Sequence, residues 1–314
     1  MNPNENRNPG EPGSAPEPAP LRAPWPQPLR ITSLVLSLAM LIAACVSLVF
    51  AHDVFRTGDA RVALGGAGGS VALFTIAISS FRSAGFRNLR QPRKLGLHHD
   101  PTHGAGISIP TGRTAVFTTV VAMLGLTAYG GTAAFAWHIG LGETLLPFGR
   151  DNREGALFVS LCAAVLGTIA VLIACVRFDT TLYIYRGGVR RHVCRRIFLK
   201  KQVLDTFVPW GSITRIGAGD LGVRGGTTAH PVIDLHTAEP LPSDSRTRHD
   251  SEHRLAVMAH QLVVEPNTLF ALLEKLAEDP ACRERLVESD AIDLLCPPPL
   301  RERFRAARAK KAIR

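Results

Sequence analysis

The sequence has little cysteine, and its six cysteines follow no recognisable pattern. No two of them show the C-x-x-C spacing, and the chain gives no sign of a disulfide framework. Cys45, Cys162 and Cys175 lie within apolar runs, whereas the other three are scattered further along the chain. Cysteines of this kind suit a reducing compartment, so we expect the soluble part of the protein to face the cytosol.

Motifs of catalysis are also missing. There is no G-x-S-x-G, and neither glycine run, Gly65–Gly69 or Gly217–Gly226, carries the G-K-[ST] ending of a phosphate-binding loop. The aspartates after residue 176 stand apart near expected strands and turns, so no pair of catalytic carboxylates can be placed. We therefore expect no enzyme activity, no catalytic residue and no cofactor.

One cluster combines metal-ligand residue types, and its members are His98, His99, Asp100 and His103. Imidazoles beside a carboxylate are able to bind Zn²⁺. However, no second group of ligands stands at a usual spacing, and Pro101 and Gly104 favour a flexible loop. A polar loop is the preferred interpretation, and we expect no metal site.

Charged side chains are absent from four long apolar runs, which are Ile31–Ala51, Val62–Phe81, Thr114–Trp137 and Gly155–Val176. Each run is close to the roughly 20 residues that a helix needs to cross a bilayer. The chain is 46% hydrophobic with a mean hydropathy of +0.12, which suits a protein that is part membrane and part soluble. We therefore predict four transmembrane helices.

The first run has an alternative interpretation as a lipoprotein signal. The segment Ile42–Cys45 resembles a lipobox, in which the cysteine becomes a lipidated N-terminus. Against this, residues Val46–Ala51 stay apolar after the cysteine, and the run is too long for the hydrophobic part of a signal peptide. A retained span is favoured.

Charge asymmetry between the loops predicts the orientation. The loop 82–113 carries six Lys or Arg residues and a single acid, Asp100, whereas His52–Arg61 and His138–Glu154 each carry two arginines offset by acids. Basic loops stay on the cytoplasmic side. We expect a multi-pass protein of the inner (plasma) membrane with the 82–113 loop and both termini in the cytoplasm.

Small residues predict how the spans pack. Gly65 and Gly69 stand four apart in the second run, and Ala163 and Gly167 repeat this spacing in the fourth. Pairs of small residues at this spacing let two helices approach closely. The pattern predicts a close contact between spans two and four.

The residues after the last span read as several strands closed by one helix, which makes a small α+β domain. The strand candidates are 180–185, 189–193, Phe207–Ile216, Pro231–His236 and Leu255–Val264. Pro266–Glu278 has the apolar spacing of an amphipathic helix. We expect the core of the domain to include Trp210, Ile213, Leu269 and Leu273.

Three segments carry a resemblance to a known family: TTLYIYRGGVRRHV at 180–193, VPWGSITRI at 208–216 and EPNTLFALLEKL at 265–276. They resemble the bacterial pleckstrin-homology-like domains fused to membrane hairpins in actinobacteria. The resemblance implies a partly open β-barrel in which a strand with Pro-Trp packs on the sheet and a final helix plugs one end. Gly217–Gly226 and the polar insert Ala238–His253, expected to be a mobile loop, depart from the family pattern.

The sequence thus divides into four parts. Residues 1–30 are rich in Pro, Asn, Glu and Gly, which predicts a disordered tail. Residues 31–176 form the transmembrane region, with its basic cytoplasmic loop, and residues 177–288 form the cytoplasmic domain. Residues 289–314 are a basic tail, in which Leu300–Arg314 reads either as a basic amphipathic helix or as an exposed, frayed one.

Basic residues crowd the start of the soluble domain, and the formal net charge of the chain is +10. Close to an anionic leaflet, each such residue contributes roughly 1 kcal/mol. We expect these side chains to face lipid, although they equally serve as orientation signals: Arg186, Arg190, Arg191, Arg195, Arg196, Lys200 and Lys201. No aromatic platform accompanies them, so nucleic acid is not expected as a partner.

Two functions from different classes fit these features. The first is a non-enzymatic, membrane-anchored interaction or scaffolding protein that binds the lipid bilayer, its anionic headgroups or a membrane protein partner. The second is a small transporter or channel-like protein that works as an oligomer. The four runs contain no ionisable residue of the kind that usually marks an ion pathway, which favours the first function.

Overall fold

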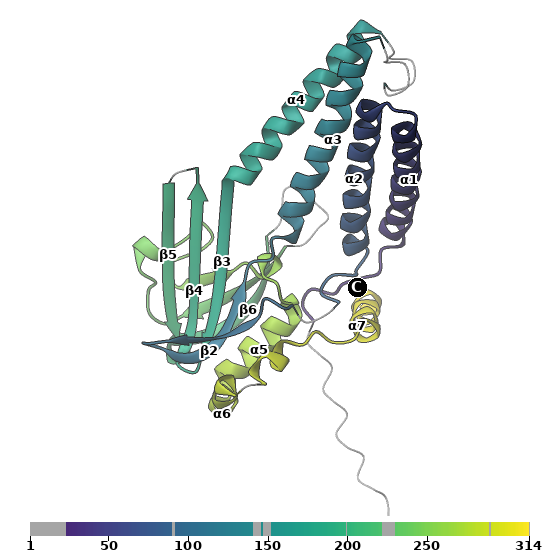
Figure 1. Ribbon diagram of the computed structural model, residues 1–314. Coiled ribbons are helices and arrows are strands. Elements are labelled where there is room, and N and C mark those ends of the chain that lie inside the picture. The colour runs from purple at the N-terminus through teal and green to yellow at the C-terminus, as the bar shows by residue number, and fades with distance from the viewer. Residues whose placement is uncertain are drawn as a thin grey trace, which may run out of the picture.

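The computed structural model describes residues 23–89, 92–140, 146, 152–198, 200–221, 230–288 and 290–313. Within these residues, four helices are long and apolar enough to cross a membrane, which confirms that the four predicted runs form helices of spanning length. Figure 1 shows them as two hairpins standing on a β-rich domain. They are α1 (Ile31–Arg56), α2 (Ala60–Ser83), α3 (Thr114–His138) and α4 (Arg153–Cys175).

Polar residues fix the starts of two spans. Asp59 accepts a hydrogen bond from the backbone N–H of Val62 at the start of α2. Asn152 accepts one from the N–H of Gly155 at the start of α4. These caps satisfy donors that a helix end leaves unpaired. Each helix runs antiparallel to the one before it. The end of α2, the start of α3 and the end of α4 therefore lie at the same end of the bundle, next to the β-rich part (Figure 1).

The small residues of α2 face different neighbours from those expected. A Cβ added to Gly68 would lie 2.8 Å from the carbonyl oxygen of Gly125 in α3, and one on Gly69 would lie 3.5 Å from Ser47 in α1. In α4, Gly167 faces Thr127 of α3. The predicted contact between spans two and four is therefore wrong, because the helices pack in sequence order and α3 lies between them.

Five strands form one antiparallel sheet in the order β1-β2-β3-β4-β5 within the described chain. The first two come from the loop between α2 and α3, and Ile107 and Ile109 of β2 are fully buried. The domain predicted to begin at residue 177 therefore also includes these two strands, which precede it in the sequence. The strands are β1 (Gly96–Asp100), β2 (Gly104–Pro110), β3 (Val176–Tyr185), β4 (Gly188–Ile197) and β5 (Lys200–Pro209).

The second described sheet has three antiparallel strands, and α5 (Pro266–Glu278) packs against it. Leu269 and Leu273 of this helix are fully buried in the core. We call strands β1 to β8 together with α5 the β domain. The strands of this sheet are β6 (Ile213–Asp220), β7 (Pro231–Thr237) and β8 (Arg254–Val257).

A corner at Trp210 separates the two sheets. The predicted single strand Phe207–Ile216 is interrupted by the 3-10 turn Trp210–Ser212. Trp210 is buried and its ring N–H donates to the carbonyl of Tyr185, while Ile213 is half-buried against the same core. Pro209 has no N–H to continue a ladder, which suits the end of a strand.

The barrel stays open on the opposite side. There, an isolated bridge joins Thr111, which follows β2, to Leu262, which lies beyond the second sheet. The predicted strand Leu255–Val264 is shorter than expected, because β8 ends at Val257 and the 3-10 turn Ala259–Gln261 follows. Two antiparallel sheets and a C-terminal helix are thus present, without a closed barrel.

The polar insert packs against the rest of the β domain, and only part of the glycine-rich segment is described. In the polar insert, Leu241 and Ser245 are buried, so the expectation of a mobile loop for Ala238–His253 is wrong. In the glycine-rich segment, Gly217 and Gly219 belong to β6, while residues 222–229 lie outside the described chain.

The N-terminal segment, residues 1–30, was expected to be disordered, and its first 22 residues lie outside the described chain. The described part departs from this expectation. Trp25 is buried, and its ring meets Phe270 of α5 edge-on at a centroid distance of 5.7 Å. Its ring N–H donates to Gly219 O, and its backbone N–H donates to Asn267. This segment therefore bridges the β domain and the start of α1.

The C-terminal segment forms α7 (Leu300–Ile313), which lies beneath α1 and α2 (Figure 1). Arg303 is buried, and its guanidinium donates to the carbonyls of Arg87 and Asn88. Of the two sequence interpretations, a frayed helix is excluded for the described residues, because this docking fixes α7 against the bundle.

Candidate membrane-facing site

The site begins where the last apolar helix becomes a strand. Helix α4 ends at Cys175, and Val176 opens β3 without a linker. Val176 pairs with Ile197, and Ile197 pairs with Lys200 across the next turn. The turn between β4 and β5 therefore lies level with the end of α4, which Figure 1 shows from the side.

Phe198 occupies this turn in an unusual conformation. Its φ is +51°, in the left-handed region, and 57% of its surface is exposed. For a bulky residue this region costs roughly 1–2 kcal/mol, and two-residue turns usually place Asn, Asp or Gly there. An exposed aromatic ring is thus held at a position where a small polar residue would be more stable.

Four basic residues of β4 and β5 flank this turn, and we call them together with Phe198 the β-tip: Arg195, Arg196, Lys200 and Lys201. All four are exposed, and Arg196 stands directly opposite Lys201 in the strand register. Like charges directly opposite each other destabilise a sheet. Within the described chain no carboxylate forms an ion pair with them, so a counter-anion from outside would relieve this repulsion.

Apolar surface continues beside the β-tip. Phe178 and Val203 are 51% and 46% exposed, and the guanidinium of Arg195 lies 5.1 Å from the ring centre of Phe178. Exposed rings next to cationic groups are typical of surfaces that meet a lipid headgroup layer. This end of the domain can therefore contact both the charged and the apolar parts of a leaflet.

Arg191 does not belong to this surface, so its predicted contact with lipid is wrong. Arg191 points into the core of the β domain, where it is 2% exposed and binds Asp250. Alternation along β4 decides this outcome, because Leu182 and Val189 occupy the same inner face. Sequence proximity alone does not separate the arginines on the inner face of β4 from those on its outer face.

Arg190 lies on the outer face of the sheet but is already paired with two acids. Its guanidinium donates to Asp205 at 2.6 Å and to Asp100 at 2.5 Å. The hydrogen bond from Arg190 lowers the pKa of Asp205 below its usual value, against the effect of burial. Arg186, at the far end of β3, pairs with Glu284 at 2.5 Å. Neither arginine is part of the β-tip.

The histidine cluster makes structural contacts in the hairpin formed by β1 and β2. Asp100 accepts hydrogen bonds from the backbone N–H groups of Thr102 and His103, which fixes the turn between β1 and β2. His98 packs on Tyr183, and His103 stacks on Phe207 at a centroid distance of 4.0 Å. Among the described residues, no group of three His, Cys, Asp or Glu side chains is placed to hold a metal ion.

These ring contacts form an aromatic row on the outer face of the five-stranded sheet, which sequence reasoning missed. Tyr183 and Tyr185 stack on each other, and the two histidines extend the row on either side. The alternation in TTLYIY could have placed both tyrosines on one face. Their histidine and phenylalanine neighbours come from segments far apart in the sequence.

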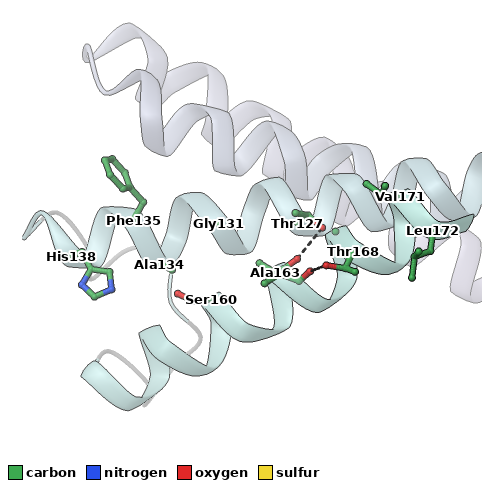
Figure 2. A pocket seen from close by; sticks show the side chains of 12 residues that line it. Thr127, Gly131, Ala134, Phe135, His138, Ser160, Ala163, Thr168, Val171 and Leu172 are labelled. Atoms are coloured by element: carbon green, nitrogen blue, oxygen red, sulfur yellow. Dashed lines mark hydrogen bonds between the residues drawn. The ribbon is translucent and has the colours of Figure 1, made fainter. Parts of the chain in front are cut away.

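Within the bundle, a groove of about 810 Å³ lies between α3 and α4. Figure 2 shows Thr127, Ala163 and Thr168 beside it. The hydroxyls of Thr127 and Thr168 donate to carbonyls of their own helices, at Met123 and Ala164. The groove walls are therefore mostly apolar, and their small residues let α3 and α4 pack closely.

Comparisons of the chain with protein-family models, with curated proteins and with solved structures find no match.

Proposed function

We propose that the chain is a non-enzymatic interaction or scaffolding protein of the plasma membrane, with both termini and the β domain in the cytoplasm. We further propose that the β domain is pleckstrin-homology-like and rests on anionic lipid through the β-tip. Two antiparallel sheets meeting at a corner, with a C-terminal helix against them, support the family assignment.

The level of the β-tip relative to α4 is the observation that carries this proposal. The 23 residues of α4 reach about 34 Å at 1.5 Å per residue, enough for a hydrocarbon core of roughly 30 Å. If α4 spans the bilayer, Val176 and its partner Ile197 lie at the membrane surface. Phe198 then meets the boundary between headgroups and acyl chains, with the basic residues at headgroup level.

The distribution of charge supports a cytoplasmic location of the β domain and an anionic lipid as its ligand. The loop 82–113 and the segment after α4 carry most of the basic residues near the spans, which favours the cytoplasmic side for the β domain. The inner leaflet is rich in anionic lipid, and its field attracts cations within about 10 Å. Contact through four exposed cations holds the domain in one orientation, as a scaffold requires.

A depth measurement on the full chain tests the proposal. A polarity-sensitive dye would be attached to a cysteine-free protein carrying Phe198→Cys, in nanodiscs of phosphatidylglycerol or phosphatidylcholine. Gly187→Cys, in the turn at the opposite end of β4, is the matched control. We expect blue-shifted emission and quenching by brominated acyl chains only at position 198, and more strongly with phosphatidylglycerol. Equal, water-like emission at both positions in both lipids would overturn the proposal.

A further inference from the structure

Three segments distant in sequence meet at the base of the α1–α2 hairpin. The backbone N–H of Arg30 donates to the carbonyl of Ala84 at 3.0 Å. Gly85 has a φ of +114°, and a Cβ there would lie 3.1 Å from Phe304 of α7 and 3.2 Å from the carbonyl oxygen of Pro28. The start of α1, the end of α2 and the C-terminal helix are therefore in direct contact.

Helix α7 is locked across this base. The guanidinium of Arg303 donates to Pro298 O at 2.9 Å as well as to Arg87 O and Asn88 O at 2.8 and 3.0 Å. Phe304 meets Phe86 edge-on at 6.2 Å between ring centroids. Arg303 thus ties α7 both to the segment before it, at Pro298, and to the loop after α2, at Arg87 and Asn88.

Three further arginines lie on the segments that meet here, and we call them the cradle: Arg30, Arg82 and Arg87. Burial lowers the pKa of Arg87, and the positive charges of Arg82 and Arg30 lower it further. Arg87 nevertheless keeps an exposed surface. Within the described chain, no carboxylate forms an ion pair with any of the three. Arg301, Arg305 and Arg308 of α7 add exposed positive charge.

An anion is the ligand that such a group favours. Repulsion between three guanidinium groups costs stability, and a phosphate that accepts hydrogen bonds from them converts that cost into binding. Each guanidinium offers a planar pair of donors that matches phosphate oxygens. The cradle therefore fits a phosphate group better than a point cation or a neutral ligand.

The surroundings of the cradle point to a lipid as the source of the phosphate. Leu29, Phe81 and Leu89 are 41%, 37% and 49% exposed, and each is within two residues of a cradle arginine. The cradle also stands at the ends of α1 and α2, where headgroups meet spanning helices. A soluble phosphate would gain nothing from this apolar rim, whereas acyl chains cover it.

We propose that the cradle at the base of the α1–α2 hairpin, closed by α7, is a binding site for the phosphate of an anionic membrane lipid. The site is separate from the β-tip and does not depend on it. The β-tip offers a broad charged surface, whereas the cradle selects one headgroup and fixes the hairpin, α7 and the β domain relative to the leaflet.

Lipid binding to the full chain tests this proposal, with phosphatidylglycerol titrated into protein in a zwitterionic detergent and bound lipid counted by native mass spectrometry. The test variant is Arg30→Gln with Arg87→Gln, and the matched control is Arg215→Gln with Arg248→Gln, which removes the same charge from exposed positions outside both the cradle and the β-tip. Losing two headgroup contacts should weaken phosphatidylglycerol binding about thirtyfold, and the control should change it less than about threefold. Phosphatidylcholine should bind equally weakly to all.

Three outcomes would overturn the cradle assignment. These are unchanged affinity in the test variant, equal losses in both double variants, and displacement of the lipid by an equal concentration of glycerol phosphate, which would assign the site to a soluble phosphate. If the double variant lowers the thermal midpoint, Arg30→Gln alone replaces it, because this side chain is exposed. The single change should weaken binding about fivefold, and no change would overturn the proposal.

Discussion

Arg191 of β4 and Asp250 of the polar insert form a bidentate ion pair inside the β domain. Nη1 lies 2.7 Å from Oδ1 and Nη2 lies 2.6 Å from Oδ2, and both side chains are almost fully buried. Arg191 also donates to the carbonyl of Ala256 in β8, and Asp250 accepts from the backbone N–H of Ala256 and of Thr247. The pair therefore joins the two sheets through a segment that reads as a loop.

Removing one member of this pair should destabilise the β domain strongly. Arg191→Gln leaves the Asp250 carboxylate buried without its partner, which typically costs about 3–5 kcal/mol. Arg195→Gln, an exposed change on the same strand, should stay within about 0.5 kcal/mol. Urea denaturation of the full chain in detergent, followed by tryptophan fluorescence, measures both. Equal midpoints for the two variants would contradict this role of the pair.

The same pair predicts how stability responds to acid. Burial favours the neutral form of Asp250, but the hydrogen bonds and charge of Arg191, together with the backbone N–H groups of Ala256 and Thr247, outweigh it, so the pKa of Asp250 lies below its usual value. The unfolded chain, with a pKa of about 3.9 for this group, binds the proton first as pH falls. Stability from the pair is therefore complete above about pH 5 and is lost as pH falls through the folded-state pKa.

Urea midpoints at pH 7, 5, 4 and 3 check this expectation. The free energy of unfolding should decrease below pH 5, and Asp250→Asn should show a lower value at pH 7 with a flatter dependence below pH 5. A variant whose midpoints fall with pH as steeply as those of the original chain would show that other carboxylates control the acid response.

Much of the fold was predictable, because its signals are local. Four uncharged runs predict four spanning-length helices, and the spacing of Leu269 and Leu273 predicts α5. The contribution of β1 and β2 was not predictable, because pairing of Ser108 with Tyr183 joins segments separated by a whole helical hairpin. Periodicity shows which residues form a strand but not which strand they pair with.

This pairing predicts that the domain does not fold from its contiguous sequence alone. A fragment of residues 176–288 lacks Ile107 and Ile109, which are fully buried against the core. At about 1.5–3 kcal/mol for each buried side chain, these two alone remove about 3–6 kcal/mol, a large share of the roughly 5–15 kcal/mol by which a domain is stable. We expect disordered NMR spectra for this fragment, and dispersed spectra once residues 95–111 are joined to it by a flexible linker. Dispersed spectra for both would contradict the prediction.

The spacing of small residues identified helix surfaces but not their partners. Gly65–Gly69 does contain a close approach to another helix, yet it occurs at Gly68, against Gly125 of α3. A pattern of small residues leaves the partner undetermined, because any neighbouring backbone can fill the space.

The β-tip was visible as a run of charge in the sequence, but separating it from Arg190 and Arg191 required the strand register.

Two alanine variants of α3 should therefore differ in sign or size. A Cβ on Gly125 would lie 2.7 Å from the carbonyl oxygen of Gly68, so Gly125→Ala must push α2 and α3 apart, at a cost of about 1–3 kcal/mol. A Cβ on Gly131 meets nothing within 4 Å, so Gly131→Ala should be neutral or slightly stabilising. Unfolding in mixed micelles with rising dodecyl sulfate measures the difference, and equal loss in both would contradict the packing.

Phe198 allows a prediction in which stability and lipid contact change in opposite directions. Its φ of +51° suits Asn better than a bulky ring, so Phe198→Asn should stabilise the β domain by about 1 kcal/mol in detergent. The same change removes the exposed ring that we propose to enter the leaflet. Hydrogen exchange of residues 194–204 in nanodiscs should then show weaker protection by phosphatidylglycerol than in the original chain. If the variant gained stability and kept full lipid protection, the strain at Phe198 would have no function at the membrane.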